Sequence, residues 1–502
     1  MNKNFINIEN TKKINLSEVP LSTFDDFYNE IEILMAKNAK VIQYFAFEMN
    51  NKVMLIIILR TEMLWIGLCE APNEYESLTK KYEQFNEYER EIAEQFSIKP
   101  IGHPWFKSLR YHKNYVGKKD LFNNDYEKVI PGNYPFYKME GEEVHQVAVG
   151  PIHAGVIEPG HFRFNCVGEK VYNLEIQHGY QHRGIEKQLE NVKLKKIPTI
   201  IESISGDSTI VHSISYSEAI EEMMNIKINE NEKLLRLISL ELERIANHIG
   251  DLGALSGDIA FLTVSSYYGR IRGEFLNILL EISGNRFGRG LIRPGTENMI
   301  SEQQKNNFIK KIKQLEKEII NVGDMFFSQA GVLSRLEDTG IVEKNIAEKI
   351  NMVGIVGRAS GINYDVRRFF PNESWKKIKL EEIIETSGDA MARAMIRYKE
   401  TKESLKIVQN LLKKIKSIDS KVVIQNFKLP KETLILTLQE GWRGELSHCI
   451  ITNKDGKIIR YKIKDPSFNN WKGLEIAVRN EGIYDFPLCN KSFNLSYSGF
   501  DL

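Results

Sequence analysis

The chain has 502 residues, which at about 100–200 residues per domain predicts more than one domain and a large core. Its 68 Lys and Arg balance its 67 Asp and Glu, so the formal net charge is +1. This balance excludes a strongly basic protein, and we therefore expect no nucleic-acid partner. A hydrophobic share of 42% is too small for an integral membrane protein.

The four cysteines lie far apart, and no CxxC pair is present. This spacing argues against a disulfide scaffold, and against a metal or iron–sulfur site built mainly from the chain's own thiolates. The first residues are polar, and the longest apolar run, Val53–Leu59, is far shorter than the roughly 20 residues of a membrane helix. We expect a cytoplasmic chain that meets a membrane only through a partner.

Residues 20–125 are expected to form an α+β domain. Val41–Met49 and Lys52–Leu59 are rich in β-formers and are joined by two asparagines, which predicts a hairpin. The charged stretch Glu74–Phe96 predicts a helix with its aromatic residues on one face, and a turn at Gly102–Pro104 follows. Residues 126–144 are polar and irregular and are assigned as a linker.

Residues 145–502 are expected to form a second, mainly helical domain. Apolar residues recur every three or four positions in Asn231–Gly250 and again between residues 308 and 322, as amphipathic helices require. Near the end, Thr433–Leu438, Leu446–Thr452 and Lys457–Ile463 resemble strands, which predicts a small C-terminal β element.

The densest cluster of unusual residues is the Gly- and Pro-rich loop from residue 150 to residue 161, which carries His153 and His161. These imidazoles could hydrogen-bond a carbonyl ligand or bind a metal. The alternative, which the residues alone favour, is that they bind backbone carbonyls at a turn. His178 and His182 are four residues apart, so one helical face could present both to a metal, but no third ligand is evident, and the preferred interpretation is that they are solvated or structural histidines.

Residues 202–208 precede a predicted helix, for which Asp207 or Ser208 is the expected N-cap. His212 lies four residues further on, but the strand–elbow context of a serine hydrolase is missing. Further along, Arg358, Arg367 and Arg368 accompany Asp365, a pattern that buried ion pairing explains as well as a ligand does. No P-loop or Rossmann glycine motif is present. The residues alone thus indicate a two-domain, helix-rich protein.

Ordered strings along nearly the whole chain resemble the small (30 kDa-type) and large (49 kDa-type) subunits of respiratory complex I fused together. Glu87–Glu91, followed by Phe96 and Gly102–Pro104, is similar to the small subunit. The strings that resemble the large subunit are Gly150–His153 with His161, Gly179–Lys187, Leu240–His248, Arg293–Gly295, Arg358–Gly361, Asp365–Arg367 and Arg443–Glu445.

The fused form most resembles the large subunit of membrane-bound, energy-converting [NiFe] hydrogenases, which holds its metals with four thiolates in RxCGxC and DPCxxC motifs. Here the matching strings are Ser203–Ser208 and Asn494–Gly499. The four ligand positions therefore fall at Ser205, Ser208, Ser496 and Gly499. Serine hydroxyls are poor substitutes for soft thiolates, and glycine has no side chain. We expect no metal bound by this chain and no hydrogenase activity.

The resemblance implies a subunit of an ion-translocating redox complex with a degenerate pocket. His153, His161, Asp207 and His212 are the candidate residues lining this pocket. The resemblance implies a mainly α-helical hydrogenase/complex I large-subunit domain after the α+β domain. It also implies a small [4Fe–4S] partner subunit, membrane-arm subunits of antiporter type, and a peripheral position on the cytoplasmic face of the membrane. The alternative is an NADH- or ferredoxin-linked quinone oxidoreductase subunit that binds a quinone in this pocket. The position of the tyrosine that binds quinone in complex I falls near Ile200, which has no hydroxyl.

Overall fold

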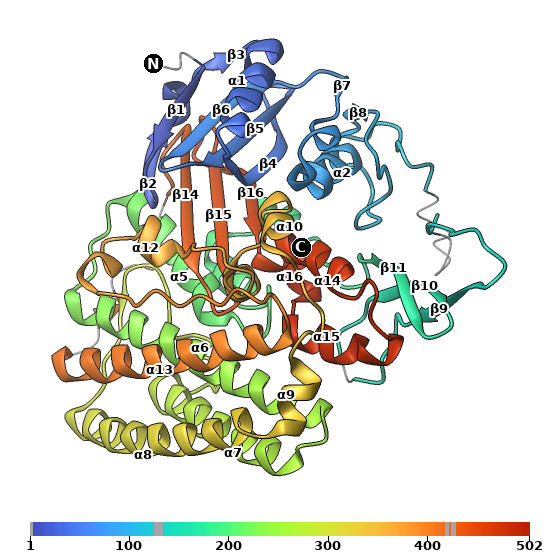
Figure 1. Cartoon of the computed structure of the whole chain (residues 1–502). Coiled ribbons are helices and arrows are strands. Elements are labelled where there is room, and N and C mark those ends of the chain that lie inside the picture. The colour runs from blue at the N-terminus through green and yellow to red at the C-terminus, as the bar shows by residue number, and fades with distance from the viewer. Residues whose placement is uncertain (1–3, 125–133, 156, 417–420, 423–427) are drawn as a thin grey trace.

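The computed structural model describes residues 4–124, 134–155, 157–416, 421–422 and 428–502. Helices and several sheets are both present, which confirms the expected mixed fold. In Figure 1 the N-terminal strands lie at one end, long helices lie at the other, and the strands of the C-terminal sheet lie between them. Among the described residues, none of the helices combines the length and the hydropathy needed to cross a bilayer.

The N-terminal part contains a sheet with strand order β1-β6-β5-β4, in which β3 also pairs with β6. The predicted hairpin is confirmed, and Asn50 and Asn51 have φ angles of 53° and 61°, as a tight turn between two strands requires. The elements are β1 (Phe5–Ile8), β2 (Lys12–Asn15), β3 (Leu21–Ser22), α1 (Phe24–Ala36), β4 (Lys40–Met49), β5 (Lys52–Arg60), β6 (Leu64–Glu70), β7 (Glu74–Glu76), α2 (Asn86–Phe96) and β8 (Lys99–Ile101).

The predicted helix from Glu74 to Phe96 is wrong at its beginning. Residues 74–76 form β7, which pairs parallel with β8, and the helix itself begins at Asn86. Tyr75 is buried while its two neighbours are exposed, so the alternation of a strand outweighs the helical pattern there. Phe85, Tyr88 and Ile92 are buried as expected.

A three-stranded antiparallel sheet follows the segment that was assigned as a linker. Residues 126–133 of that segment lie outside the described residues, residues 134–143 contain no helix or strand, and Val144 already begins a strand. The sheet has the order β11-β10-β9, and its core side chains pack against the C-terminal helices. Its strands are β9 (Val144–Val149), β10 (His161–Val167) and β11 (Lys170–Gln177).

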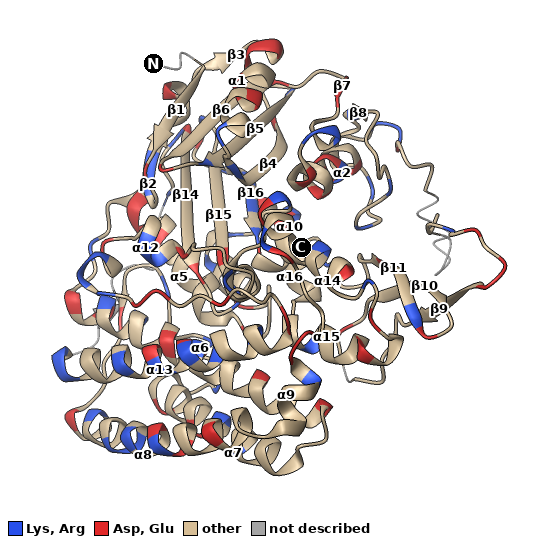
Figure 2. Ribbon diagram, viewed as in Figure 1, with Lys and Arg blue, Asp and Glu red and all other residues tan. Residues whose placement is uncertain are grey.

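Long helices form the body of the second part, and α6 packs against both α7 and α13 (Figure 1). The two predicted amphipathic helices are confirmed as α6 and α8, and Figure 2 shows basic and acidic residues along the outer helix α8. The elements are α3 (Ile185–Asn191), α4 (Ile197–Ile201), α5 (Thr209–Met224), α6 (Glu230–Asp258), α7 (Leu262–Ser283), β12 (Thr296–Glu297), α8 (Glu302–Phe327), α9 (Ala330–Leu336), α10 (Lys344–Lys349), α11 (Gly354–Ala359), α12 (Val366–Phe369), α13 (Ala390–Lys414) and β13 (Lys421–Val422).

The three predicted C-terminal strands are confirmed, and they form a buried sheet with the order β16-β15-β14-β2. The fourth strand, β2, comes from the N-terminal end of the chain and pairs antiparallel with β14. Helix α5 packs on this sheet. The elements are β14 (Thr433–Glu440), β15 (Glu445–Thr452), β16 (Ile458–Lys464), α14 (Pro466–Ala477), α15 (Phe486–Phe493) and α16 (Tyr497–Phe500).

Candidate functional site

The four positions that correspond to metal ligands in the resembling hydrogenases come together in the fold. Ser205 and Ser208 precede α5, whereas Ser496 is the N-cap of α16 and Gly499 lies within it. The Oγ atoms of Ser205 and Ser496 are 3.0 Å apart, and the backbone N–H of Gly499 donates to Ser496 Oγ at 2.9 Å. The three serines are buried. Segments 291 residues apart are thus joined here by hydroxyl hydrogen bonds.

Arg443 and Asp207 form an ion pair beside these serines. The guanidinium donates to both carboxylate oxygens at 2.7 Å and, through Nε, to the Asn494 carbonyl at 2.6 Å. Ser205 and Ser208 donate to the same carboxylate at 2.9 and 3.2 Å. Burial alone would raise the pKa of Asp207, but the Arg443 charge and these hydrogen bonds hold it below its usual value. Asp207 is therefore ionised at neutral pH.

Gly499 is surrounded closely enough to exclude a side chain. A Cβ atom at this position would lie 2.7 Å from Asp465 Cγ and 2.9 Å from Ser496 Oγ. Both distances are shorter than ordinary van der Waals contacts, so a cysteine here would need neighbouring groups to move.

The residues present do not fit a nickel–iron centre. Hydroxyl oxygens and a glycine stand where soft thiolates are required, and the cationic Arg443 lies within 3.5 Å of Ser205 and Ser208. Within the described part of the chain, no group of three or more His, Cys, Asp or Glu side chains is arranged to hold a metal ion.

His212 lies in the first turns of α5 and connects this site to the C-terminal sheet. Its Nε2 is 3.6 Å from Asp465 Oδ2, and its Nδ1 is 3.0 Å from Nε2 of His448, whose Nδ1 is 2.8 Å from the Tyr461 hydroxyl. All four side chains are buried. Burial, and secondly the neighbouring His212, hold the pKa of His448 well below its usual value, so that this imidazole is neutral.

One set of tautomers satisfies this chain of contacts. If Tyr461 donates to His448 and His448 donates to His212, the remaining N–H of His212 faces Asp465. Burial would raise the pKa of Asp465, but the neighbouring His212 and the Arg443 charge lower it, so the N–H of His212 faces an ionised carboxylate at 3.6 Å, beyond hydrogen-bond distance. The opposite set would direct a nitrogen lone pair at the carboxylate and is disfavoured.

Glu243 of α6 caps the start of α5, a role that the sequence alone did not reveal. The backbone N–H groups of Ile210 and Val211 donate to its carboxylate at 2.6 and 3.2 Å. Ser208 is the N-cap residue as predicted, but its side chain makes no capping bond. Asn247, one turn along α6, donates to the Asp207 carbonyl at 2.8 Å. The i, i+4 spacing of Glu243 and Asn247 is the signal that places both on one helix face.

The loop from residue 150 to residue 161 reaches this site through Glu158. Glu158 accepts from the Tyr497 N–H at 3.1 Å and from the Ser498 hydroxyl at 3.2 Å, next to Ser496. Val156 lies outside the described residues. Glu158 was not among the predicted pocket residues, and its place beside Pro159 offers no distinctive signal.

The two loop histidines bind the loop's own backbone. His153 Nε2 donates to the Gly160 carbonyl at 2.7 Å, and His161 Nδ1 donates to the Gly150 carbonyl at 3.2 Å. The second nitrogen of His161 accepts from Arg163 Nε at 3.3 Å. Burial lowers the pKa of His161. The structure thus places both histidines in the turn-stabilising arrangement that the residues alone favoured.

His178 and His182 do not share a helix face, and both imidazoles pack against other side chains, as the structural interpretation expects. They follow the end of β11 in a turn, where His178 packs between Phe500 and Trp471 and His182 stacks on His112. Between the two histidines lies Gly179, whose φ of 99° is incompatible with a helix.

The arginine cluster near Asp365 forms buried ion pairs. Arg358 contacts Glu400 and Glu440, each at 2.7 Å, and Arg367 contacts Asp365 at 2.6 Å. Arg368 differs, because its partner Glu382 is exposed. The Arg358 charge lowers the pKa of Glu400 despite its burial, which is the signature of a structural network.

Comparisons with known proteins agree with the resemblance. Residues 258–423 and 416–501 match the family described as respiratory-chain NADH dehydrogenase, 49 Kd subunit. The fused C/D polypeptide of the NADH-quinone oxidoreductase of Bacteroides thetaiotaomicron is 28% identical over 402 residues, which are 75% of each chain. Membrane-bound hydrogenase subunit alpha of Pyrococcus furiosus is 29% identical over 365 residues, 70% of this chain and 85% of the relative.

A solved structure also shares the fold. A chain of the membrane-bound sulfane sulfur reductase, an archaeal respiratory membrane complex, superposes with a TM-score of 0.67 at 21% identity, covering 73% of this chain and all of that one. Residues 258–501 therefore match the respiratory-chain NADH dehydrogenase 49 Kd subunit family, and the chain is similar to NADH-quinone oxidoreductase C/D polypeptides and to a membrane-bound hydrogenase subunit alpha.

Proposed function

We propose that this chain is a subunit of a membrane-bound, ion-translocating redox complex related to complex I and to energy-converting hydrogenases. In this role its pocket carries no nickel–iron centre. Its relatives are oxidoreductase and hydrogenase subunits, which supports the class of complex. The observation that carries the proposal is the joining of Ser205 and Ser496 by a hydrogen bond at the place where thiolates would be needed.

The chain's own polar groups give this site a different chemistry. Asp207 and Arg443 neutralise each other, and the serine hydroxyls bind to them and to one another. His212 stands between the ionised Asp465 and the neutral His448, so a proton accepted by His448 would be stabilised by the carboxylate beyond His212. We propose that Asp207 and His212 line the pocket for this reason.

We propose that His153 and His161 act by changing the position of the loop from residue 150 to residue 161. Protonation of His161 would abolish its acceptance of the Arg163 N–H and would put two cations side by side. The loop touches the C-terminal segment through Glu158, so a change in the loop is transmitted to Tyr497 and Ser498 beside Ser496. His153 and His161 would thereby bias a two-state loop.

The proposal includes partners and a location. We propose a small [4Fe–4S] subunit docked at the loop side, antiporter-type membrane-arm subunits, and peripheral attachment at the cytoplasmic face of the membrane. Quinone binding stays a prediction and is not part of the main proposal. His161 uses both ring nitrogens within the protein and Ile200 has no hydroxyl, so neither residue offers a free hydrogen-bonding group to a quinone. The mainly helical second domain and the α+β first domain are proposed with the boundaries 145–502 and 20–125.

The proposal is tested by isolating the tagged chain from the membranes of its own organism and measuring electron flow and ion transport of the complex. A co-purifying iron–sulfur subunit and membrane-arm subunits are expected. His161→Ala is expected to change the ratio of ion transport to electron flow, whereas His145→Ala, an exposed histidine on β9, is expected to leave it unchanged. A chain that purifies without membrane subunits contradicts the proposal.

A further inference from the structure

A cavity lies away from the serine site, further along α5. It has a volume of about 980 Å³ and lies between the turn that joins β1 to β2, helices α5 and α6, and residues 370–376. Its apolar walls are formed by Ile8, Leu64, Ile214, Leu237, Phe370 and Trp375. The volume lies at the upper end of the roughly 300–1,000 Å³ of cavities that take small organic ligands.

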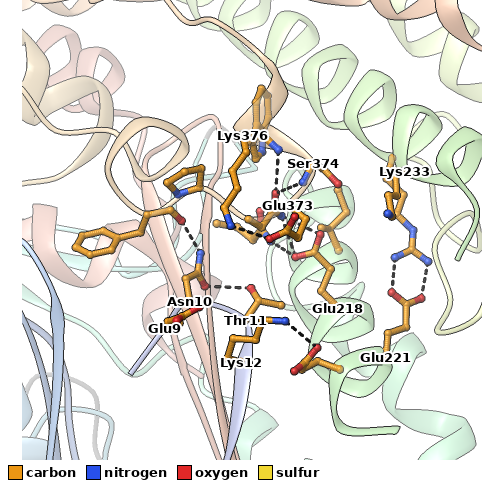
Figure 3. A pocket seen from close by; sticks show the side chains of 18 of the residues that line it. Glu9, Asn10, Thr11, Lys12, Glu218, Glu221, Lys233, Glu373, Ser374 and Lys376 are labelled. Atoms are coloured by element: carbon orange, nitrogen blue, oxygen red, sulfur yellow. Dashed lines mark hydrogen bonds and ion pairs between the residues drawn. The ribbon is translucent and has the colours of Figure 1, made fainter. Parts of the chain in front are cut away.

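Glu218 of α5 is the polar centre of this cavity. Figure 3 shows it between the turn that carries Asn10 and Thr11 and the segment that carries Glu373 and Lys376. Its carboxylate accepts from Asn372 Nδ2 at 2.9 and 3.0 Å and from Gln439 Nε2 at 2.6 Å. These donors are uncharged amides. Among the described residues no Lys, Arg or His nitrogen lies within 4.0 Å of this carboxylate.

Four of the cationic residues that line the cavity pair with other carboxylates. Arg236 binds Glu221 at 2.7 Å, as Figure 3 shows for the Glu221 carboxylate. The other pairs are Lys233 with Glu230 at 2.7 Å, Lys376 with Glu373 at 2.7 Å and Lys12 with Glu222 at 3.6 Å; Glu9, Glu62 and Lys227 also line the cavity. Glu218 thus lacks the ionic partner that Glu221, Glu230 and Glu373 have.

Burial without such a partner raises the pKa of Glu218 to about 7. The distant Arg236 charge and the amide hydrogen bonds act in the opposite direction but do not cancel the effect of burial. A cation placed against this carboxylate would favour its ionised form, and the apolar walls would at the same time bury a hydrocarbon body.

We propose that this cavity binds a small organic cation, whose ammonium or guanidinium group pairs with Glu218 and whose apolar body lies against Ile214, Leu237 and Trp375. Such binding would not depend on the redox role proposed for the serine site, because none of the serine-site residues lines the cavity.

The test is calorimetric titration of the full-length chain with hexylammonium as the probe and with hexanol as its uncharged match. Charged hydrogen bonds in protein sites change affinity by about tenfold or more. Hexylammonium is therefore expected to bind at least about tenfold more weakly to Glu218→Gln than to the wild type. Glu302→Gln, at an exposed carboxylate of α8 that pairs with Lys305 and does not line the cavity, is expected to keep wild-type affinity.

The pH dependence gives a second readout. Hexylammonium stays charged between pH 6 and pH 8, whereas Glu218 gains its charge over that range, so wild-type affinity is expected to rise with pH. The Glu218→Gln variant is expected to lose this rise. Circular dichroism at each pH confirms that the variants are folded. Equal affinity of wild type and Glu218→Gln, binding of hexanol as tight as that of hexylammonium, or an absence of binding would each overturn the proposal.

Discussion

Ser205 and Ser496 place their hydroxyl oxygens 3.0 Å apart, although they lie on segments separated by 291 residues. Both are buried, and Ser496 Oγ also caps α16 through the Gly499 N–H. Hydroxyls can satisfy one another in this way, whereas two thiolates at the same distance would repel each other without a metal between them.

A double-mutant cycle measures this contact. Ser205→Ala is expected to lower the free energy of unfolding by about 1 kcal/mol, and Ser496→Ala by about 1–2 kcal/mol because a helix cap is lost as well. The double variant is expected to lose less free energy of unfolding than the sum of the two single losses, because both single variants remove the same hydrogen bond. Urea unfolding of the four proteins provides the values. Strict additivity would show that the two hydroxyls are not coupled.

Gly499 is expected to be intolerant of a side chain. Gly499→Ala would bring a Cβ atom to 2.7 Å from Asp465 Cγ, and we expect a loss of about 1–3 kcal/mol of stability. Gly206→Ala is the matched control, because a Cβ atom there meets nothing within 4 Å. Thermal unfolding of both variants distinguishes the cases. Equal melting temperatures would contradict the packing described for the vestigial ligand position.

Arg443→Met tests the ion pair with Asp207. A fully buried pair loses about 3–5 kcal/mol when one partner is removed, but 32% of the Asp207 side chain is exposed, so we expect about 2 kcal/mol. Arg368→Met, which breaks the more exposed pair with Glu382, is expected to cost much less stability, because water screens an exposed ion pair. Adding Asp207→Asn to Arg443→Met is expected to recover part of the loss. Chemical denaturation of the three variants measures their free energies of unfolding. Equal losses of stability in Arg443→Met and Arg368→Met would contradict the structural role of the Arg443–Asp207 pair.

The low pKa of His448 in the folded chain predicts a loss of stability in mild acid. Because burial and His212 lower its pKa in the folded chain, the unfolded chain takes up the proton first, near pH 6.5. The stability that neutral His448 contributes is therefore complete above pH 6.5. It is lost as the pH falls, and the free energy of unfolding decreases by up to about 1.4 kcal/mol for each pH unit. His448→Gln is expected to flatten the dependence of unfolding free energy on pH between 6.5 and 5. Parallel curves for wild type and variant would show that His448 is protonated in the folded protein.

Local patterns in the sequence predicted local structure well. The hairpin at Asn50 and Asn51 follows from turn chemistry between two β-rich runs, and α6 follows from its periodicity. The helix predicted from Glu74 failed because a short strand can form wherever a partner such as β8 is present, and a partner is not visible locally. The pairing of β2 with β14 was beyond prediction for the same reason.

The candidate site was predictable mainly through the resemblance. Matching two motifs placed Ser205, Ser208, Ser496 and Gly499 at one site, and the structure brings them together. The groups that occupy the site were not predictable, because Arg443 and Asp465 come from separate elements of the C-terminal sheet region. Glu243 was missed because its i, i+4 spacing with Asn247 places both residues on one helix face but does not show which helix end that face meets.

The most direct test of the central claim is metal analysis of the complex isolated from its own membranes, combined with an assay of hydrogen uptake. Because hydroxyls, a glycine and the guanidinium of Arg443 occupy the place of the thiolates, the account predicts no stoichiometric nickel and no hydrogen uptake. One nickel per chain together with hydrogen uptake would contradict it.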